Sequence, residues 1–157
     1  MLGVLDSVFL FAYAAGLYIA GSIGDHMDMK KALVVGMLLS AVASSMFGVL
    51  GLLGSHSIYL FCLAWGGTGL LQASGWPTNV AIMGRWFAKS ERGTVFGFWS
   101  SNASAGNIIG TYMVVAVYAL LDKGEHAWQW SMLVTSMSIV VEALAIVFFL
   151  VQHPRSK

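Results

Sequence analysis

The chain has 157 residues, of which 58% are hydrophobic and only 10% are charged, with a formal net charge of +1. A soluble domain usually carries about 25% charged residues, so this composition excludes an ordinary water-soluble globule and indicates a protein embedded in lipid. No basic stripe with interleaved aromatic residues supports nucleic-acid binding, and the single cysteine, Cys62, excludes an internal disulfide framework.

Five apolar stretches are long enough to cross a bilayer, which requires about 20 residues of helix. They cover residues 4–23, 32–54, 58–83, 94–121 and 129–151. These stretches are too long for strands, and they do not show the alternating pattern of a membrane barrel. The sequence therefore predicts an all-α fold, a polytopic membrane helix bundle with five spans.

The third stretch contains two features that interrupt a straight helix. Gly66, Gly67 and Gly69 allow it to bend, and Trp76-Pro77 places a proline inside it. Because proline removes one backbone donor, we expect a kink at that point.

Small residues recur every four positions in the first and fourth stretches, a spacing that lets two helices approach closely in lipid. They are Ala12, Gly16, Ala20 and Gly24 in the first stretch, and the pairs Gly93–Gly97 and Gly106–Gly110 in the fourth. We expect close helix packing at both places.

Basic residues in the connectors predict the orientation in the membrane. The first and third connectors and the tail together hold seven of them: Lys30, Lys31, Arg85, Lys89, Arg92, Arg155 and Lys157. The opposite side holds only Lys123. Because basic residues in short loops favour the cytoplasm, we expect a cytosolic C-terminus and an N-terminus in the lumen or exterior.

The first connector carries a recognisable motif. Gly21-Ser-Ile-Gly-Asp25, followed by Lys30 and Lys31, resembles a loop signature of the major facilitator superfamily of transporters. The match is partial, because His26 stands where an arginine is common. The resemblance implies that Asp25 and the basic pair latch the cytoplasmic side through contacts that break when the transporter rocks.

A second group of motifs narrows the resemblance to the organophosphate antiporter group, and within it to the sugar-phosphate exchangers of solute carrier family 37. The motifs are Gly75-Trp-Pro-Thr-Asn79, the segment 84–93 with Arg85 and Arg92, Phe98-Trp99, and Gly106-Asn107-Ile-Ile-Gly110. The resemblance implies exchange of phosphorylated sugars or related anions for phosphate by alternating access, in the endoplasmic reticulum membrane. Residues 1–157 would then supply helices two to six of an N-terminal six-helix half. The first helix and the second six-helix half would be partners outside this chain.

Neutral side chains are the candidates for the substrate cavity, because no Lys, Arg or His lies deep in a predicted span. They are Tyr13, Gln72, Trp76, Asn79, Asn102 and Asn107, with Trp99 as a further aromatic neighbour. The alternative for the polar residues is hydrogen bonding between helices, and for the tryptophans it is packing. The resemblance implies that the arginines that hold phosphate belong to helices outside this chain.

Glu142 is the one acid well inside a predicted span. An intramembrane carboxylate is costly and therefore a candidate proton or ion site; alternatively it is protonated and hydrogen-bonded to Ser138. The four histidines are spread over connectors and ends, so we expect no metal site. We also expect no cofactor and no enzymatic activity, since the chain has neither a phosphate-cradling loop nor paired carboxylates.

Two other functions stay open. The chain could be a truncated, non-transporting membrane protein that acts as a partner-binding half. A channel is less consistent with the sequence, because it shows neither a charged ring nor a carbonyl filter.

Overall fold

The computed structural model describes residues 2–24, 28–121 and 124–151. Within these ranges all regular secondary structure is α-helical, which confirms the predicted fold class. The helices are α1 (Leu2–Gly24), α2 (Met29–Leu52), α3 (Ile58–Gln72), α4 (Gly75–Trp86), α5 (Arg92–Ser100), α6 (Asn102–Leu120) and α7 (Ala127–Phe149).

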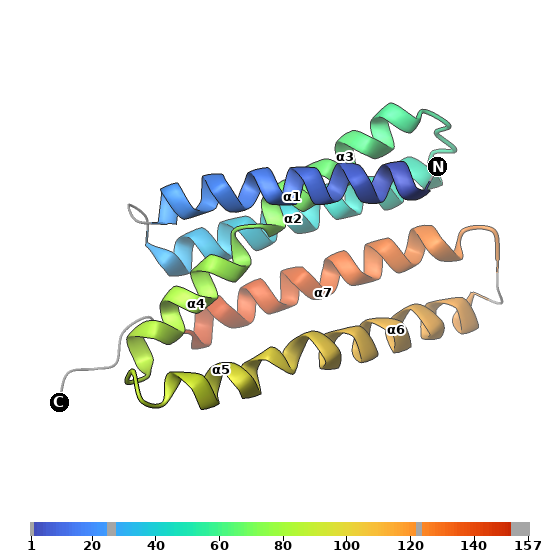
Figure 1. Cartoon of the computed structure of the whole chain (residues 1–157). Coiled ribbons are helices and arrows are strands. Elements are labelled where there is room, and N and C mark those ends of the chain that lie inside the picture. Colours follow the sequence, from blue (N-terminus) through green and yellow to red (C-terminus); the bar gives the residue numbers. More distant parts are fainter. Residues whose placement is uncertain (1, 25–27, 122–123, 152–157) are drawn as a thin grey trace.

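The helices run back and forth along one direction, so that successive connectors lie at opposite ends of the bundle (Figure 1). The most extensive helix contacts are those of α2 with α7 and of α1 with α3, and α2 also packs on α3. Helix α6 packs mainly on α7, and less extensively than these pairs, and α5 contributes no buried residue. The bundle is therefore tight around α1, α2, α3 and α7, and open along α5 and α6.

Small side chains explain why α2 and α7 pack so closely. Lipid gives helices no hydrophobic driving force to associate, so close van der Waals contact between small residues takes its place. The buried residues of the two helices are mostly small: Ser40, Ala41, Ala43, Ser44 and Gly48 in α2, and Ala127, Ser131, Ser136 and Ala143 in α7. A methyl group added at Gly48 would lie only 2.9 Å from the backbone oxygen of Gln129.

Four segments are long and apolar enough to cross a membrane by themselves: Leu2–Gly21, Met29–Leu52, Arg92–Leu120 and Ala127–Phe149. They correspond to the first, second, fourth and fifth predicted spans. The third expected span, 58–83, is not one continuous helix, because it is divided into α3 and α4 at Ala73 and Ser74. Together α3 and α4 still run from one end of the bundle to the other (Figure 1).

Pro77 and two hydroxyl side chains account for the division. A proline at this position cannot donate to the carbonyl four residues earlier, which belongs to Ala73. The Ser74 hydroxyl donates to the Leu71 carbonyl at 3.1 Å, and the Thr78 hydroxyl donates to the Ser74 carbonyl at 2.7 Å. The Ser74 carbonyl also accepts from the Thr78 backbone N–H at 3.4 Å, so the Thr78 hydroxyl reinforces a long backbone hydrogen bond beside the division.

Two glycines make room for this junction. A Cβ added at Gly16 on α1 would lie 2.5 Å from the Leu70 carbonyl oxygen and 2.7 Å from the Ala73 Cβ. A Cβ added at Gly36 on α2 would collide with the Ser74 Oγ. Close packing predicted from the small residues of the first span is confirmed at Gly16.

The same prediction is wrong for the fourth span. Within the described residues, a Cβ added at Gly93, Gly97, Gly106 or Gly110 would meet no atom within 4 Å. These glycines lie on the open α5–α6 segment, so their four-residue spacing marks no helix contact in this structure.

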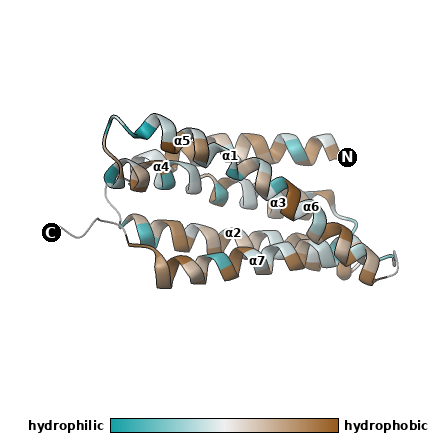
Figure 2. Ribbon diagram, turned by 90° about the horizontal axis from the view of Figure 1, so that it is seen from below, coloured by the Kyte–Doolittle hydropathy of each residue, from teal (hydrophilic) through white to brown (hydrophobic). Residues whose placement is uncertain are grey.

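Basic residues gather at one end of the bundle, where α2 begins, α4 ends and α7 ends (Figure 1). Figure 2 shows hydrophobic residues, coloured brown, along the helices of the bundle. Lys30 and Lys31 lie at this end, as do Arg85, Lys89 and Arg92. Residues Lys123, Arg155 and Lys157 lie outside the described residues.

Candidate functional site

A cleft of about 730 Å³ lies between α4 and the α5–α6 segment and is bounded at the basic end by Leu150, the residue directly after α7. One wall consists of Asn79, Ile82 and Met83 of α4 and of Phe87, which follows α4. The other wall consists of Thr94, Val95, Phe98, Trp99, Ser101 and Asn102 of the α5–α6 segment, and Leu150 completes the lining. Two of the predicted substrate residues, Asn79 and Asn102, therefore face the same cleft from opposite walls.

A tryptophan pair stands at the side of this cleft. The ring centroids of Trp76 and Trp99 are 4.6 Å apart, and the ring planes are tilted by 45°. Trp76 remains 53% exposed, so contact with Trp99 leaves much of its ring accessible. Trp99 lines the cleft, whereas Trp76 contacts Trp99 without lining the cleft itself, and the pair joins α4 to α5.

Helix geometry explains why the four side chains meet. Trp76 and Asn79 are three residues apart on α4, and Trp99 and Asn102 are three residues apart across the short α5–α6 junction. Residues at this spacing lie on one face of a helix. Contact between the two tryptophans therefore places the two asparagines on facing walls of the cleft.

The asparagine amides are available to a ligand. Among the described residues, neither the Asn79 nor the Asn102 side chain has a hydrogen-bond partner, so the interhelical hydrogen bond considered as their alternative role is not found. The Ser101 hydroxyl, by contrast, already donates to the Phe98 carbonyl at 2.6 Å. Each amide can donate two hydrogen bonds and accept two.

Arg92, at the start of α5, binds backbone carbonyls and does not line the cleft. Its Nε donates to the Phe87 carbonyl at 3.1 Å, and its guanidinium also donates to the Gly84 carbonyl. Both carbonyls belong to the C-terminal end of α4, where a cation is favourable. Arg92 therefore fastens the end of α4 to the start of α5, whereas Arg85 is exposed.

Lys30 and Trp86 hold the end of α7 in a similar way. The Lys30 Nζ donates to the Leu150 carbonyl at 2.9 Å, and the Trp86 Nε1 donates to the Val151 carbonyl at 2.9 Å. Asp28 caps the start of α2 by accepting from the backbone N–H groups of Lys30 and Lys31. The start of α2, the end of α4 and the end of α7 are thereby joined at the basic end.

For the side chains of the remaining residues of the predicted latch, the described part of the chain shows no hydrogen bond with another helix. Asp25 lies outside the described residues. Gly21 is exposed and has no close neighbour, and Lys31 is exposed.

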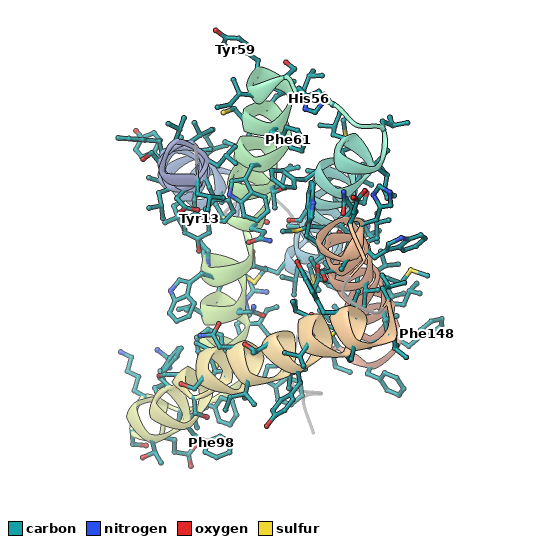
Figure 3. All side chains as sticks on the ribbon, turned by 90° about the vertical axis from the view of Figure 1, so that its right-hand side faces the viewer. Tyr13, His56, Tyr59, Phe61, Phe98 and Phe148 are labelled. Atoms are coloured by element: carbon teal, nitrogen blue, oxygen red, sulfur yellow. The ribbon has the colours of Figure 1, made fainter. Side chains whose placement is uncertain are left out.

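Three predicted substrate residues lie outside the cleft. Tyr13 stacks on Phe9 within α1, with ring centroids 6.1 Å apart. Gln72 is exposed at the end of α3, and Asn107 is exposed on α6 beside a separate hollow. The labelled side chains of Tyr59 and Phe148 project outward from their helices (Figure 3).

Glu142 lies on an exposed position of α7. The Ser138 hydroxyl donates to the Val134 carbonyl at 3.1 Å and lies 3.9 Å from the Met113 Sδ. Within the described residues no hydrogen bond joins Ser138 to Glu142. The described part of the chain also contains no group of three or more His, Cys, Asp or Glu side chains that could hold a metal ion.

Trp99 is the cleft residue to which sequence reasoning gave too little weight. The signal that could have found it is a repeated pattern, Trp76-Pro-Thr-Asn79 and Trp99-Ser-Ser-Asn102. A shared tryptophan-to-asparagine spacing in two consecutive predicted spans indicates two matching helix faces.

Comparisons with known proteins extend over almost the whole chain. The sequence profile of the Major Facilitator Superfamily matches residues 1–157. Sugar phosphate exchanger 3 of Xenopus laevis is 44% identical over 155 residues, which cover 98% of this chain and 30% of that protein. The human protein of the same name is 40% identical over 154 residues, with the same two shares.

A plant relative has a related name. Putative glycerol-3-phosphate transporter 1 of Arabidopsis thaliana is 40% identical over 157 residues, which cover 99% of this chain and 29% of that protein. The chain thus spans about 30% of the length of these relatives. No solved structure matches the chain.

Proposed function

Because this chain belongs to the Major Facilitator Superfamily, we propose that it forms part of a transporter that exchanges phosphorylated sugars or related organic anions for phosphate. The observation that carries this proposal is the likeness of nearly the whole chain to sugar phosphate exchangers. A relative named as a putative glycerol-3-phosphate transporter suggests the same chemical class, a phosphate ester of a hydroxylated carbon chain. The proposed activity is movement of the substrate, without a chemical reaction and without a cofactor.

In this proposal residues 1–157 supply helices two to six of the N-terminal six-helix half. A first helix and a second six-helix half complete the pathway. Substrate binds near the middle of the membrane between the two halves, and rocking of one half against the other opens the site to each side in turn.

The charge of the substrate restricts where its phosphate can bind. A phosphate ester carries about two negative charges near neutral pH, so its site needs cationic or strong donor groups that face a wet cavity. The cleft lining is neutral, and Arg92 and Lys30 are bound to backbone carbonyls. We therefore place the groups that neutralise phosphate outside this chain.

The neutral side chains are then assigned to the substrate cavity. Asn79 and Asn102 form its core with Trp99, since these three line one cleft, and Trp76 is assigned to its edge through its contact with Trp99. Tyr13, Gln72 and Asn107 are assigned to more distant parts of the same pathway.

The basic end of the bundle is assigned to the cytoplasmic gate. The loop with Gly21, Asp25, Lys30 and Lys31 forms the latch of this gate. Arg85 and Arg92 occupy the neighbouring connector. The concentration of basic residues at this end supports a cytosolic C-terminus, and we place the protein in the endoplasmic reticulum membrane.

Exchange across a reconstituted membrane tests the proposal. The protein is expressed at its native length and inserted into vesicles loaded with inorganic phosphate, and uptake of labelled glucose 6-phosphate and glycerol 3-phosphate is measured. We expect uptake that depends on internal phosphate. Correctly inserted protein that exchanges neither ester nor phosphate itself would overturn the proposal and favour the partner-binding alternative.

A further inference from the structure

We propose that the cleft between α4 and the α5–α6 segment binds the uncharged, hydroxylated part of the substrate and thereby distinguishes a sugar phosphate from inorganic phosphate. The inference rests on the proposed function and adds a division of labour to it. This chain recognises the sugar, and groups outside the chain neutralise the phosphate.

The repeated pattern provides the geometric basis. Trp76-Pro-Thr-Asn79 and Trp99-Ser-Ser-Asn102 each place one indole and one amide on the same helix face. The indoles meet at 4.6 Å, and both amides line one cleft. The cleft therefore combines the Trp99 ring, which Trp76 backs at the cleft edge, with one amide on each of two walls.

The chemistry of this surface fits a sugar. The C–H groups of a sugar ring carry partial positive charge and pack favourably on the negative face of an aromatic ring. Sugar hydroxyls both donate and accept hydrogen bonds, and an asparagine amide does the same. The Asn79 and Asn102 amides have no partner among the described residues, so binding a sugar would break no hydrogen bond of the structure.

The absence of charge in the lining supports the same conclusion. Every lining residue is neutral. Arg92, at the start of α5, donates instead to the Phe87 and Gly84 carbonyls, and Lys30 donates to the Leu150 carbonyl. Inorganic phosphate offers no apolar face for the tryptophans, so this cleft contributes to its binding far less than to that of a sugar phosphate.

Comparison of two exchange reactions tests the inference. The native-length protein is reconstituted in phosphate-loaded vesicles, and the KM values for labelled phosphate and for glucose 6-phosphate are measured in the same preparation. For Asn79→Leu and Asn102→Leu, we expect the KM for glucose 6-phosphate to rise up to about tenfold relative to that for phosphate, the size of one lost neutral hydrogen bond. Trp76→Leu should shift the ratio in the same direction, and Trp76→Phe should largely restore it.

Matched controls lie outside the cleft. Trp130 on α7 is 46% exposed, close to the 53% of Trp76, so Trp130→Leu removes an equally accessible indole. Ser7→Ala removes a neutral hydroxyl from an exposed position of α1. Neither control should change the ratio of the two KM values.

The outcomes separate the inference from the proposed function. Equal changes of both KM values in the asparagine variants, or no change in either, would overturn the inference while exchange itself persists. Loss of both reactions in the unmodified protein would instead overturn the proposed function. If Trp76→Leu fails to insert because it adjoins Pro77, Asn102→Leu at an exposed helix start still decides the question.

Discussion

Lys30, at the start of α2, donates a hydrogen bond from its ammonium group to the backbone carbonyl of Leu150, 2.9 Å away at the end of α7. The two residues are 120 positions apart in the chain. Leu150 also lines the cleft between α4 and the α5–α6 segment. A residue of the predicted latch loop therefore positions one edge of the candidate substrate site.

Replacement of Lys30 by Met should loosen this end of the bundle. The ammonium binds a carbonyl that the end of α7 leaves without a helical partner, and a charged hydrogen bond of this kind contributes about 1.5–3 kcal/mol. Because the site is partly buried, we expect a loss near the lower end of that range, about 1.5 kcal/mol. Thermal unfolding of the purified protein in detergent measures it.

Lys31→Met is the matched control for this experiment. Lys31 is adjacent and exposed, and only its backbone N–H is bound, by Asp28. Equal melting temperatures of the Lys30 and Lys31 variants would show that the bond to Leu150 does not stabilise the bundle.

Replacement of Gly16 by Ala should destabilise the junction of α3 and α4. The added methyl would lie 2.5 Å from the Leu70 carbonyl oxygen and 2.7 Å from the Ala73 Cβ, so the α1 and α3 backbones must separate. Overpacking of this kind costs about 1–3 kcal/mol. The change can be read from the melting temperature.

Gly106→Ala provides the opposite test. Within the described residues nothing lies within 4 Å of its added methyl, and alanine favours a helix over glycine by about 1 kcal/mol. We expect Gly106→Ala to leave the melting temperature unchanged or raise it. A similar loss in both glycine variants would contradict the close approach of α1 to α3.

The contrast between these glycines shows what the sequence could and could not predict. Composition and the length of the apolar stretches predicted an all-helical membrane bundle, because these properties depend on the chain alone. The four-residue spacing of small residues predicted contact at Gly16 but also at Gly106, where none exists in this structure. Spacing defines a helix face, but it does not identify which helix, if any, packs on that face.

The candidate site shows the same limit. The sequence singled out Trp76, Asn79 and Asn102 as polar or aromatic groups inside spans, and the structure brings the two asparagines to one cleft and Trp76 to its edge against Trp99. The sequence gave equal weight to Tyr13 and Gln72, which lie outside this cleft. Which of these residues meet depends on how α4 turns after its break from α3, and that rotation is set by tertiary contacts.

Replacement of Arg92 by Gln should free the connector between α4 and α5. Arg92 donates to two carbonyls at the end of α4, an arrangement that the planar guanidinium suits. We expect protease cleavage within residues 88–91 to become severalfold faster in detergent-solubilised protein. Arg92→Lys should be cleaved at a rate between those of the unmodified protein and the Arg92→Gln variant, because an ammonium is a compact point charge without the guanidinium's fork of donors.

Lys89→Gln is the control for the connector. Lys89 is exposed in the same loop, and its replacement by Gln removes the same positive charge. If its variant is cleaved as fast as the Arg92 variant, loss of charge rather than loss of the two hydrogen bonds explains the result.

Charge reversal at Asp25 tests the proposed latch. Asp25→Lys should slow exchange of glucose 6-phosphate in vesicles, because the contacts that the resemblance assigns to this acid form and break in each cycle. The amount of inserted protein should stay the same, as judged by surface labelling. Unchanged exchange kinetics would remove Asp25 from the gate.

Glu142 allows a test of proton coupling. The acid lies on an exposed position of α7, and the Ser138 hydroxyl that could have satisfied it donates to the Val134 carbonyl instead. An ionisable group in a span without such a partner is a candidate for carrying a proton. We expect Glu142→Gln, which keeps the shape and removes the ionisable group, to flatten the pH dependence of exchange. Glu125→Gln, at an exposed connector position, should keep the original profile. A Glu142→Gln profile that coincides with that of the unmodified protein would assign this carboxyl group a structural role only.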